Sequence, residues 1–244
     1  MKITEQLREL LPNRYLNEDG NEFAIELLPG LSTTELNRLA KQLPEEHIPA
    51  DIQELLAFAR GFTFGGLEDI TFDGVNQFGF EELFPSAVQL GGDGFGNFWI
   101  IDIDANGKWG NVFYVCHDPA VVVKHSNNLA EFLGHIDEYG KNNDDSHLNI
   151  IHEKSVFDIW NKHEYIDIDM ARNSLDTTLR NFALSLPNNF VIADLRNIPN
   201  GLGFAWGRFG SRAKIVRCDN ALIWGVEKRT KRGFLPAIFR RKNK

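Results

Sequence analysis

The sequence has no long apolar run and very little cysteine. A membrane-spanning helix needs about 20 consecutive apolar residues, and no stretch of this chain approaches that length. The first residues, MKITEQLRELLPNRY, are charged and lack the apolar centre of a secretory signal peptide. Cys116 and Cys218 are far apart and form neither a Cys-x-x-Cys pair nor a disulfide framework. We therefore expect a cytoplasmic protein without a transmembrane segment.

The charge is distributed unevenly along the 244 residues. Residues 1–140 carry 8 Lys and Arg against 23 Asp and Glu, a net charge of −15, whereas residues 141–244 carry 18 against 11, a net charge of +7. Such a chain can bind partners of either sign, or its two halves can attract each other. The 19 Phe and 5 Trp provide ample apolar material for a core.

The pattern of residues 1–140 predicts an α+β domain with helices packed on a mostly antiparallel sheet. Apolar residues recur at helical spacing near residues 3–11, 33–43 and 50–60, and Gly61 is a plausible end for the third of these helices. Asn128 and Glu131 resemble a capping box before a fourth helix. Between the third and fourth helices, FWIIDIDA and KWGNVFYVC flank Asn106-Gly107, which is the sequence signal for a hairpin.

The hairpin is expected at the centre of the domain because both of its faces are apolar away from the turn. A two-residue loop at Asn106-Gly107 places Asp104 opposite Trp109 and Ile101 opposite Val112. One face then carries Trp99, Ile101, Ile103, Val112 and Tyr114, and the other carries Phe98, Ile100, Phe113 and Val115.

A polar segment divides the chain. The segment DEYGKNNDDSH, residues 137–147, is polar and poor in large apolar groups, and we predict a linker over residues 141–152 between residues 1–140 and a smaller α+β domain over residues 153–244. In this second domain, DMARNSLDTTLRNFALSL predicts one helix that ends before Pro187. Four strand candidates follow, and we expect them to form an antiparallel meander: NFVIADLRN, LGFAWGR, AKIVRC and ALIWGVEK.

Two motifs near the hairpin imitate ligand loops. Asp102, Asp104, Asn106 and Gly107 follow the opening of a calcium loop, but the position of the final bidentate Glu is Phe113. The glycines of GGDGFG precede a strand, whereas a phosphate-binding loop leads into a helix N-terminus. We therefore interpret both as turns.

Nothing else in the sequence indicates catalysis, a metal or a cofactor. The seven histidines show no His-Glu-x-x-His or other tight ligand spacing. His117 is expected on the strand face opposite Cys116, and a site joining Cys116 to His125 across a turn is disfavoured. There is no Gly-x-Ser-x-Gly elbow. We expect a protein that is not an enzyme and has neither a metal nor another cofactor.

The C-terminal segment KRTKRGFLPAIFRRKNK is strongly basic. Pro236 argues against a continuous amphipathic helix. The segment can be a solvated or self-docking tail, or it can contact a nucleic acid or an anionic membrane. The candidate contacts to a polyanion are Lys228, Arg229, Lys231, Arg232, Arg240 and Arg241.

Taken in order, several segments resemble the SUKH superfamily, which includes the Smi/Knr fungal cell-wall synthesis regulators. These segments are LPEEHIPADIQELLAFARGFTFGG, GGDGFGNFWIIDI, GNVFYVCHD and HSNNLAEFLGHI, within about residues 30–140. The sequence departs from the family pattern where ARGFTFGG replaces the usual Asn-Gly-Gly, and residues after 150 lie outside the resemblance. The matching residues resemble fold determinants: Pro49, Gly61, Gly92, Asp93, Gly96, Trp99 and Phe132.

The resemblance implies an α+β fold and a function in protein binding. Bacterial members are largely immunity proteins that neutralise polymorphic or contact-delivered toxins, and fungal members are interaction hubs. The leading hypothesis is therefore an immunity protein that binds a toxin domain; the alternatives are a regulatory scaffold and a nucleic-acid-associated protein. An acidic surface would suit a basic nuclease toxin, and its predicted contacts are Glu68, Asp69, Asp73, Glu81, Glu82 and Asp93.

Overall fold

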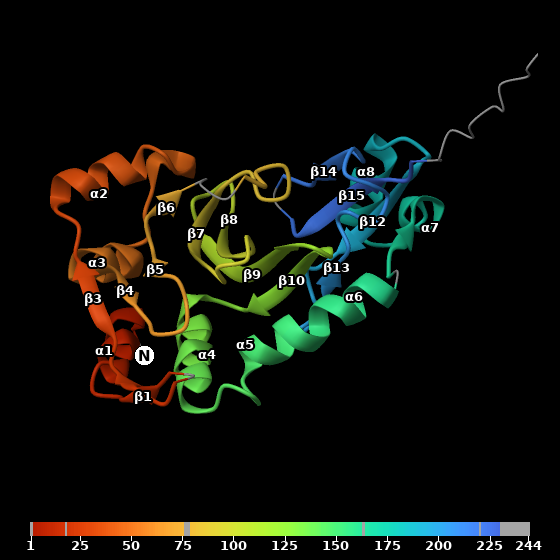
Figure 1. The fold of residues 1–244 in the computed structure, drawn as a ribbon. Coiled ribbons are helices and arrows are strands. Elements are labelled where there is room, and N and C mark those ends of the chain that lie inside the picture. Colours follow the sequence, from red (N-terminus) through yellow and green to blue (C-terminus); the bar gives the residue numbers. More distant parts are fainter. Residues whose placement is uncertain (1, 18, 76–78, 163, 220, 230–244) are drawn as a thin grey trace, which may run out of the picture.

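A six-stranded antiparallel sheet lies at the centre of the computed structural model (Figure 1). The structure describes residues 2–17, 19–75, 79–162, 164–219 and 221–229. The strands of the central sheet, in spatial order, are β13 (Gly203–Phe204), β10 (Ala120–Ser126), β9 (Trp109–His117), β8 (Phe98–Ile103), β7 (Ala87–Gly92) and β6 (Gly74–Val75).

Both faces of this sheet are buried, as the hairpin pattern predicts. Trp99, Ile101 and Tyr114 belong to one hydrophobic core, and Ile100 and Phe113 belong to another. Alternation along a strand sends successive side chains to opposite faces, so the two cores lie on opposite sides of one sheet. The predicted division of the hairpin residues between the two faces is confirmed.

The first face is covered by helices from the N-terminal half and from the region after residue 141. Leu7, Leu55 and Phe132 are representative of their buried side chains. These helices are α1 (Ile3–Leu10), α3 (Ala50–Phe58), α4 (Leu129–Lys141), α5 (His147–Ile150) and α6 (Val156–Lys162), with a π-helical turn (Ile151–Ser155) between the last two. The same side carries α2 (Thr33–Ala40), a 3₁₀ turn (Pro44–Glu46) and the short strands β1 (Tyr15–Leu16), β2 (Glu22–Phe23), β3 (Glu26–Pro29), β4 (Ala59–Thr63) and β5 (Ile70–Thr71).

The second face is covered by a four-stranded antiparallel sheet from the C-terminal half. Val191 and Trp224 face the central sheet, and Ile192 and Ile223 face two helices on the far side. The strands, in spatial order, are β11 (Ile166–Asp167), β12 (Phe190–Asp194), β15 (Ile223–Glu227) and β14 (Ile215–Arg217), and the helices are α7 (Ile168–Arg172) and α8 (Thr177–Ser185). The molecule therefore has four layers, helix, sheet, sheet and helix, as an α+β fold.

The segment predicted as a linker is partly helical and buried. Residues 141–152 contain α5 and the start of the π-helical turn, and the Leu148 and Ile151 side chains are 4% and 1% exposed in the first core. Ser146 caps α5 by accepting a hydrogen bond from the Asn149 backbone N–H at 3.2 Å. The polar composition misled the prediction because a short helix needs only one or two apolar anchors.

The predicted meander does not form in its simple order. β13 leaves the second half and pairs with β10, with Phe204 opposite Val122 and Gly203 opposite Val123. A Cβ atom at Gly203 would lie 1.7 Å from the Val122 carbonyl oxygen, so only glycine allows this approach. The predicted single helix before Pro187 is also two helices, α7 and α8, and the second is capped by Asp176.

The turn of the central hairpin is one residue longer than predicted. The Asp104 backbone N–H donates to the Lys108 carbonyl at 3.0 Å, and Gly107 adopts a left-handed φ of 74°. This is a three-residue loop with a glycine bulge. As a result Trp109 lies opposite Ile103, not Asp104, while Ile101 and Val112 pair as expected.

A buried ion pair joins the two halves. Arg217 of β14 donates two hydrogen bonds to the Asp102 carboxylate of β8, at 2.5 and 2.7 Å, and both side chains are less than one-tenth exposed. The Arg217 guanidinium also lies 5.2 Å from the centre of the Trp224 ring and 5.5 Å from that of Phe84. The pairing satisfies two charges that would otherwise be costly to bury.

Replacing Asp102 by Ala is expected to lower the free energy of unfolding by about 3–5 kcal/mol, because it leaves the Arg217 charge buried without a partner. Urea denaturation checks this value. The matched control is Glu54→Ala, which removes the exposed Lys2–Glu54 pair (2.8 Å) and should change stability within error. Equal effects of the two substitutions on the free energy of unfolding would contradict a stabilising role for the buried Asp102–Arg217 pair.

Among the described residues, no helix combines the length and apolar character needed to cross a bilayer.

Candidate functional site: an acidic turn surface and a histidine cluster

The predicted acidic contacts do not form one patch. Glu68 and Asp69 are exposed in the loop before β5, and Glu81 and Glu82 are exposed in the loop between β6 and β7. The Glu68 carboxylate lies against Gly92, where an added Cβ atom would be 2.2 Å away. Leu83, next to Glu82, packs into the core on the other side of the central sheet. The two pairs therefore border different parts of the molecule.

Two of the predicted contacts, Asp73 and Asp93, are less accessible than the other four. The Asp73 side chain is half-buried, and burial raises the pKa of its carboxyl group despite the opposing effect of Arg60. The Asp93 side chain is only 8% exposed because it is bonded within the protein. Asp93 therefore supports the surface and does not present its carboxylate to a partner.

Asp93 organises the turn between β7 and β8, residues 93–97, which we name the Phe95 turn. Its carboxylate accepts hydrogen bonds from the Phe95 backbone N–H at 2.8 Å, the Asn97 side-chain amide at 2.7 Å and the Tyr114 hydroxyl at 2.6 Å. Burial alone would raise the pKa of Asp93, but these hydrogen bonds outweigh it and the net shift is downward. Burial and the hydrogen bond to the Asp93 carboxylate raise the pKa of Tyr114.

The Phe95 turn presents one aromatic ring to solvent. Phe95 is 76% exposed between Gly94 and Gly96, which adopt left-handed φ angles of 79° and 85°. The glycines of this run therefore form a turn that enters strand β8 at Phe98, without a helix behind it. The two acidic residues that resemble part of a calcium loop have partners within the protein. The Asp102 carboxylate accepts a hydrogen bond from Arg217, and the Asp104 carboxylate accepts hydrogen bonds from the Asn106 and Lys108 backbone N–H groups in the hairpin turn.

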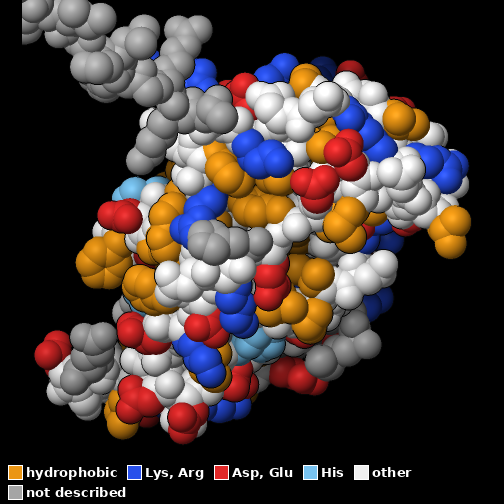
Figure 2. Space-filling view, turned by 90° about the vertical axis from the view of Figure 1, so that its right-hand side faces the viewer, with side chains coloured by type: hydrophobic (Ala, Val, Ile, Leu, Met, Phe, Trp, Pro, Cys, Tyr) orange, Lys and Arg blue, Asp and Glu red, His pale blue; other side chains and the backbone are white. Residues whose placement is uncertain are grey.

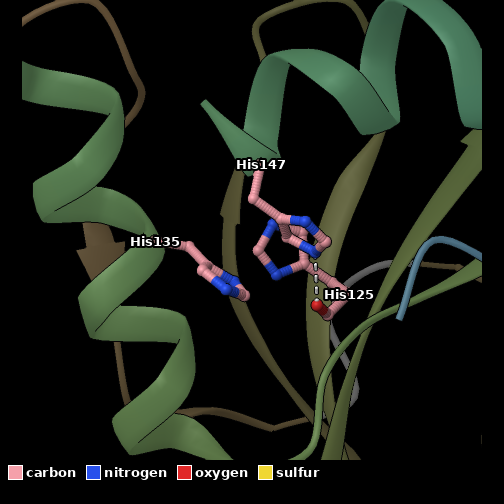
Figure 3. Close-up of side chains that lie close together, drawn as sticks. All are labelled: His125, His135 and His147. Carbon is pink, nitrogen blue, oxygen red and sulfur yellow. Dashed lines mark hydrogen bonds between the residues drawn. The ribbon is translucent and has the colours of Figure 1, made fainter. Parts of the chain in front are cut away.

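A second polar feature, not visible in the spacing of the sequence, is a histidine cluster formed by His125, His135 and His147 (Figure 3). His125 lies on β10, His135 on α4 and His147 at the start of α5. One ring nitrogen from each residue lies within 4.8 Å of the others, a set that could hold a metal ion. The sequence prediction of no metal site was based on the absence of a tight ligand spacing, whereas the fold brings together histidines that are 10 and 12 residues apart.

An irregularity in β10 places two polar side chains, those of His125 and Ser126, on the same side of the strand. Lys124 pairs with Phe113 and Ser126 with Val112, so His125 is an extra residue in a β-bulge. The Ser126 hydroxyl lies 2.7 Å from Nδ1 of His125 and 3.1 Å from Nδ1 of His135. The Lys124 side chain extends to the opposite half and donates to the Ile198 carbonyl at 2.9 Å.

The environment of the cluster disfavours protonation of two of its imidazoles, those of His125 and His135. His125 is fully buried, and burial together with His147 and His135 holds its pKa well below the ordinary value of 6.5. Burial and His147 also lower the pKa of His135, although Glu131 and Glu138 act in the opposite direction. A site joining His125 to Cys116, which the sequence disfavours, is not formed, because Cys116 lies opposite Val121. Burial raises the pKa of the Cys116 thiol.

Comparison with known families identifies the first half. Residues 30–135 match the model of the SMI1 / KNR4 family (SUKH-1). Residues 30–135 therefore form a domain of the SUKH superfamily. The match begins just after β3 and ends within α4, so it contains the core of the central sheet and the Phe95 turn. No curated protein and no solved structure matches the chain significantly.

Most of the SUKH-like residues selected from the sequence occupy buried or sterically restricted positions. Trp99 and Phe132 are buried in the first core, and Pro49 precedes α3. Gly61 does not end that helix, which stops at Phe58; it lies in β4, where an added Cβ atom would be 2.2 Å from the Ile70 carbonyl oxygen. Gly61 is thus needed for close strand approach, which helix-stop reasoning could not reveal.

The basic tail is only partly described. Lys231, Arg232, Arg240 and Arg241 lie outside the described residues. Lys228 and Arg229 lie 3.8 and 3.7 Å from Asp167 and Glu227. Figure 2 shows the face formed by the second half, where the basic, acidic and hydrophobic side chains of the described residues are interspersed. The polyanion contact stays a prediction.

Lowering the pH from 7.5 to 5.5 in the presence of a chelator is expected to destabilise the protein. Since His125 and His135 have lower pKa values folded than unfolded, the unfolded chain binds more protons below about pH 6.5. Stability therefore falls as the pH drops, by up to about 1.4 kcal/mol per pH unit for each such group. Urea denaturation at several pH values measures this slope.

The matched variants are His135→Asn, which keeps a polar group near Ser126, and His47→Asn at an exposed position. We expect the pH slope to be reduced in the first and unchanged in the second. An unchanged slope in His135→Asn would show that the cluster does not control the pH dependence.

Proposed function

We propose that this protein is a non-catalytic binding module, and that it acts as an immunity protein by binding a toxin domain. Membership of the SUKH superfamily supports a role in protein–protein interaction. Toxin neutralisation is the more specific reading, because the first half carries a net charge of −15 that suits a basic partner.

The observation that carries this proposal is the Phe95 turn. Aromatic residues supply much of the energy of protein interfaces when they are buried against a partner. Phe95 is 76% exposed, while the backbone on both sides of it is held by the Asp93 carboxylate. Such a ring is ready to enter a pocket of a partner with little loss of backbone freedom.

The surroundings of the turn supply charge. The Glu68 carboxylate lies against Gly92 at the base of the turn, and Asp69 follows it on the same loop. An apolar anchor with an acidic rim matches a basic cleft that has an apolar pocket. We propose these loops as the partner surface, because both faces of the central sheet are already covered by other elements of the protein.

Replacing Phe95 by Ala is expected to weaken toxin binding by about 30-fold, equivalent to about 2 kcal/mol, with no loss of folding. The toxin candidate is the protein encoded beside this gene. Calorimetry measures affinity, and rescue of growth during co-expression measures neutralisation. Phe157→Ala, at another exposed Phe (52%), is the control. Unchanged affinity in Phe95→Ala would refute the placement, and absence of rescue by the parent would favour a scaffold.

Charge reversal tests the contribution of each of the two acidic pairs to toxin binding. Glu68→Lys with Asp69→Lys is expected to slow association at least 10-fold at low salt, because it reverses the charge beside the Phe95 turn. Glu81→Lys with Glu82→Lys tests the predicted second pair, and Glu45→Lys with Glu46→Lys is the exposed control. Stopped-flow association rates at two salt concentrations provide the measurement. Equal rates for all three variants would exclude an acidic contact surface.

A further inference from the structure

The histidine cluster contains a ring nitrogen that the protein does not use. Nε2 of His125 is buried and has no hydrogen-bond partner among the described residues. An unpartnered buried nitrogen is costly. The side chain is fully buried, and its ring lies beside the rings of His135 and His147, with centroids 5.2 and 5.0 Å away.

The hydrogen bonds at the other nitrogens identify which atoms keep a lone pair. Nε2 of His147 lies 2.9 Å from the His125 carbonyl oxygen, which can only accept, so Nε2 carries the proton and Nδ1 is unprotonated. The Ser126 hydroxyl can accept from Nδ1 of both His125 and His135. Each imidazole then resembles a metal ligand whose second nitrogen donates to an oxygen of the surrounding protein.

From this arrangement we propose that His125, His135 and His147 bind one divalent transition-metal ion of the Zn²⁺ type. Imidazole nitrogen is a preferred ligand of this ion class, and three protein ligands leave a fourth position for water or a partner side chain. His135 and His147 are half-buried, so the fourth position lies on the solvent side of the cluster. The Glu138 carboxylate also lies near the cluster, where it accepts a hydrogen bond from the His147 backbone N–H at 3.2 Å.

Binding of the ion requires the three ligand nitrogens to move closer together. A tetrahedral ion with Zn–N bonds of about 2.0–2.1 Å needs nitrogens about 3.4 Å apart, and the structure already brings one ring nitrogen of each histidine within 4.8 Å of the others. Two imidazoles on such an ion have ring centres roughly 5 Å apart, near the two spacings made by His125. The centres of the His135 and His147 rings, 4.1 Å apart, must therefore separate by roughly 1 Å as the rings turn toward the ion.

The ion would connect three elements. His125 is fixed in the central sheet, His135 lies on the helix that ends the SUKH match, and His147 lies on the first helix after it. Binding in the folded state alone would stabilise the attachment of α5 to the SUKH domain. Metal binding is independent of the proposed toxin surface, because the Phe95 turn contains none of these residues.

The test uses the untagged full-length protein, stripped with a chelator and titrated with ZnCl₂ by calorimetry. We expect one ion per chain, with a dissociation constant in the micromolar range or below, and a melting temperature raised by about 5 °C at saturation. His135→Ala should weaken Zn²⁺ binding at least about 100-fold and remove the thermal shift. His47→Ala, at an exposed position, should behave like the parent.

A third variant keeps the test decisive if a ligand deletion disturbs folding. His135→Cys retains a donor, so it should still bind one ion; with Co²⁺ as the probe, its absorption spectrum should gain a thiolate charge-transfer band absent from the parent. Far-UV circular dichroism confirms that each variant is folded. Absence of saturable binding to the parent, or equal affinity in a folded His135→Ala, would overturn the proposal.

Discussion

The constraint on which the structure depends is the apolar character of both faces of the central hairpin. Strands β8 and β9 carry large hydrophobic side chains on successive residues, so neither face can be exposed to water without a large loss of stability. The SUKH helices cover one face. The other face must be covered by the rest of the chain, and β12 and β15 do this, with Trp224 completely buried between the sheets.

The polar contacts between the halves follow from that arrangement. Once the two sheets pack together, Asp102 is removed from water and needs the bidentate bond to Arg217. Trp224 donates its indole N–H to the Leu83 carbonyl at 2.8 Å, and Trp206 donates to the Cys116 carbonyl at 3.1 Å. The residues after 150 thus form a structural layer on the SUKH domain, and the partner surface that we propose lies on the loops at the edge of the central sheet.

Local patterns predicted much of this fold. The division of hairpin residues between faces was visible because alternation needs only sequence, and Asn128 caps α4 by accepting the Glu131 backbone N–H at 2.9 Å, as its spacing indicated. Long-range placement was not visible. The histidine cluster combines a strand bulge and two helices, β13 crosses to another sheet, and the role of Gly61 depends on a carbonyl in a different strand.

The acidic site was predicted by composition, and composition could not separate its members. Asp93 and Glu68 are both carboxylates in the sequence, yet Asp93 accepts hydrogen bonds from Tyr114 and Asn97 within the protein, whereas Glu68 is exposed. The exposure of the Phe95 ring was not predicted, because the glycine run around it resembles a phosphate-binding loop and indicated only a turn. A single large apolar residue between two glycines was the signal that could have found it.

Native-state hydrogen exchange tests the central claim, that the two halves form one cooperative unit around the central sheet. The backbone N–H groups of Phe113 in β9 and Ile192 in β12 should require the same free energy of opening, equal to that of global unfolding. Exchange of Ile192 at a much lower free energy, with Phe113 still protected, would show that the second half opens alone and would contradict this account.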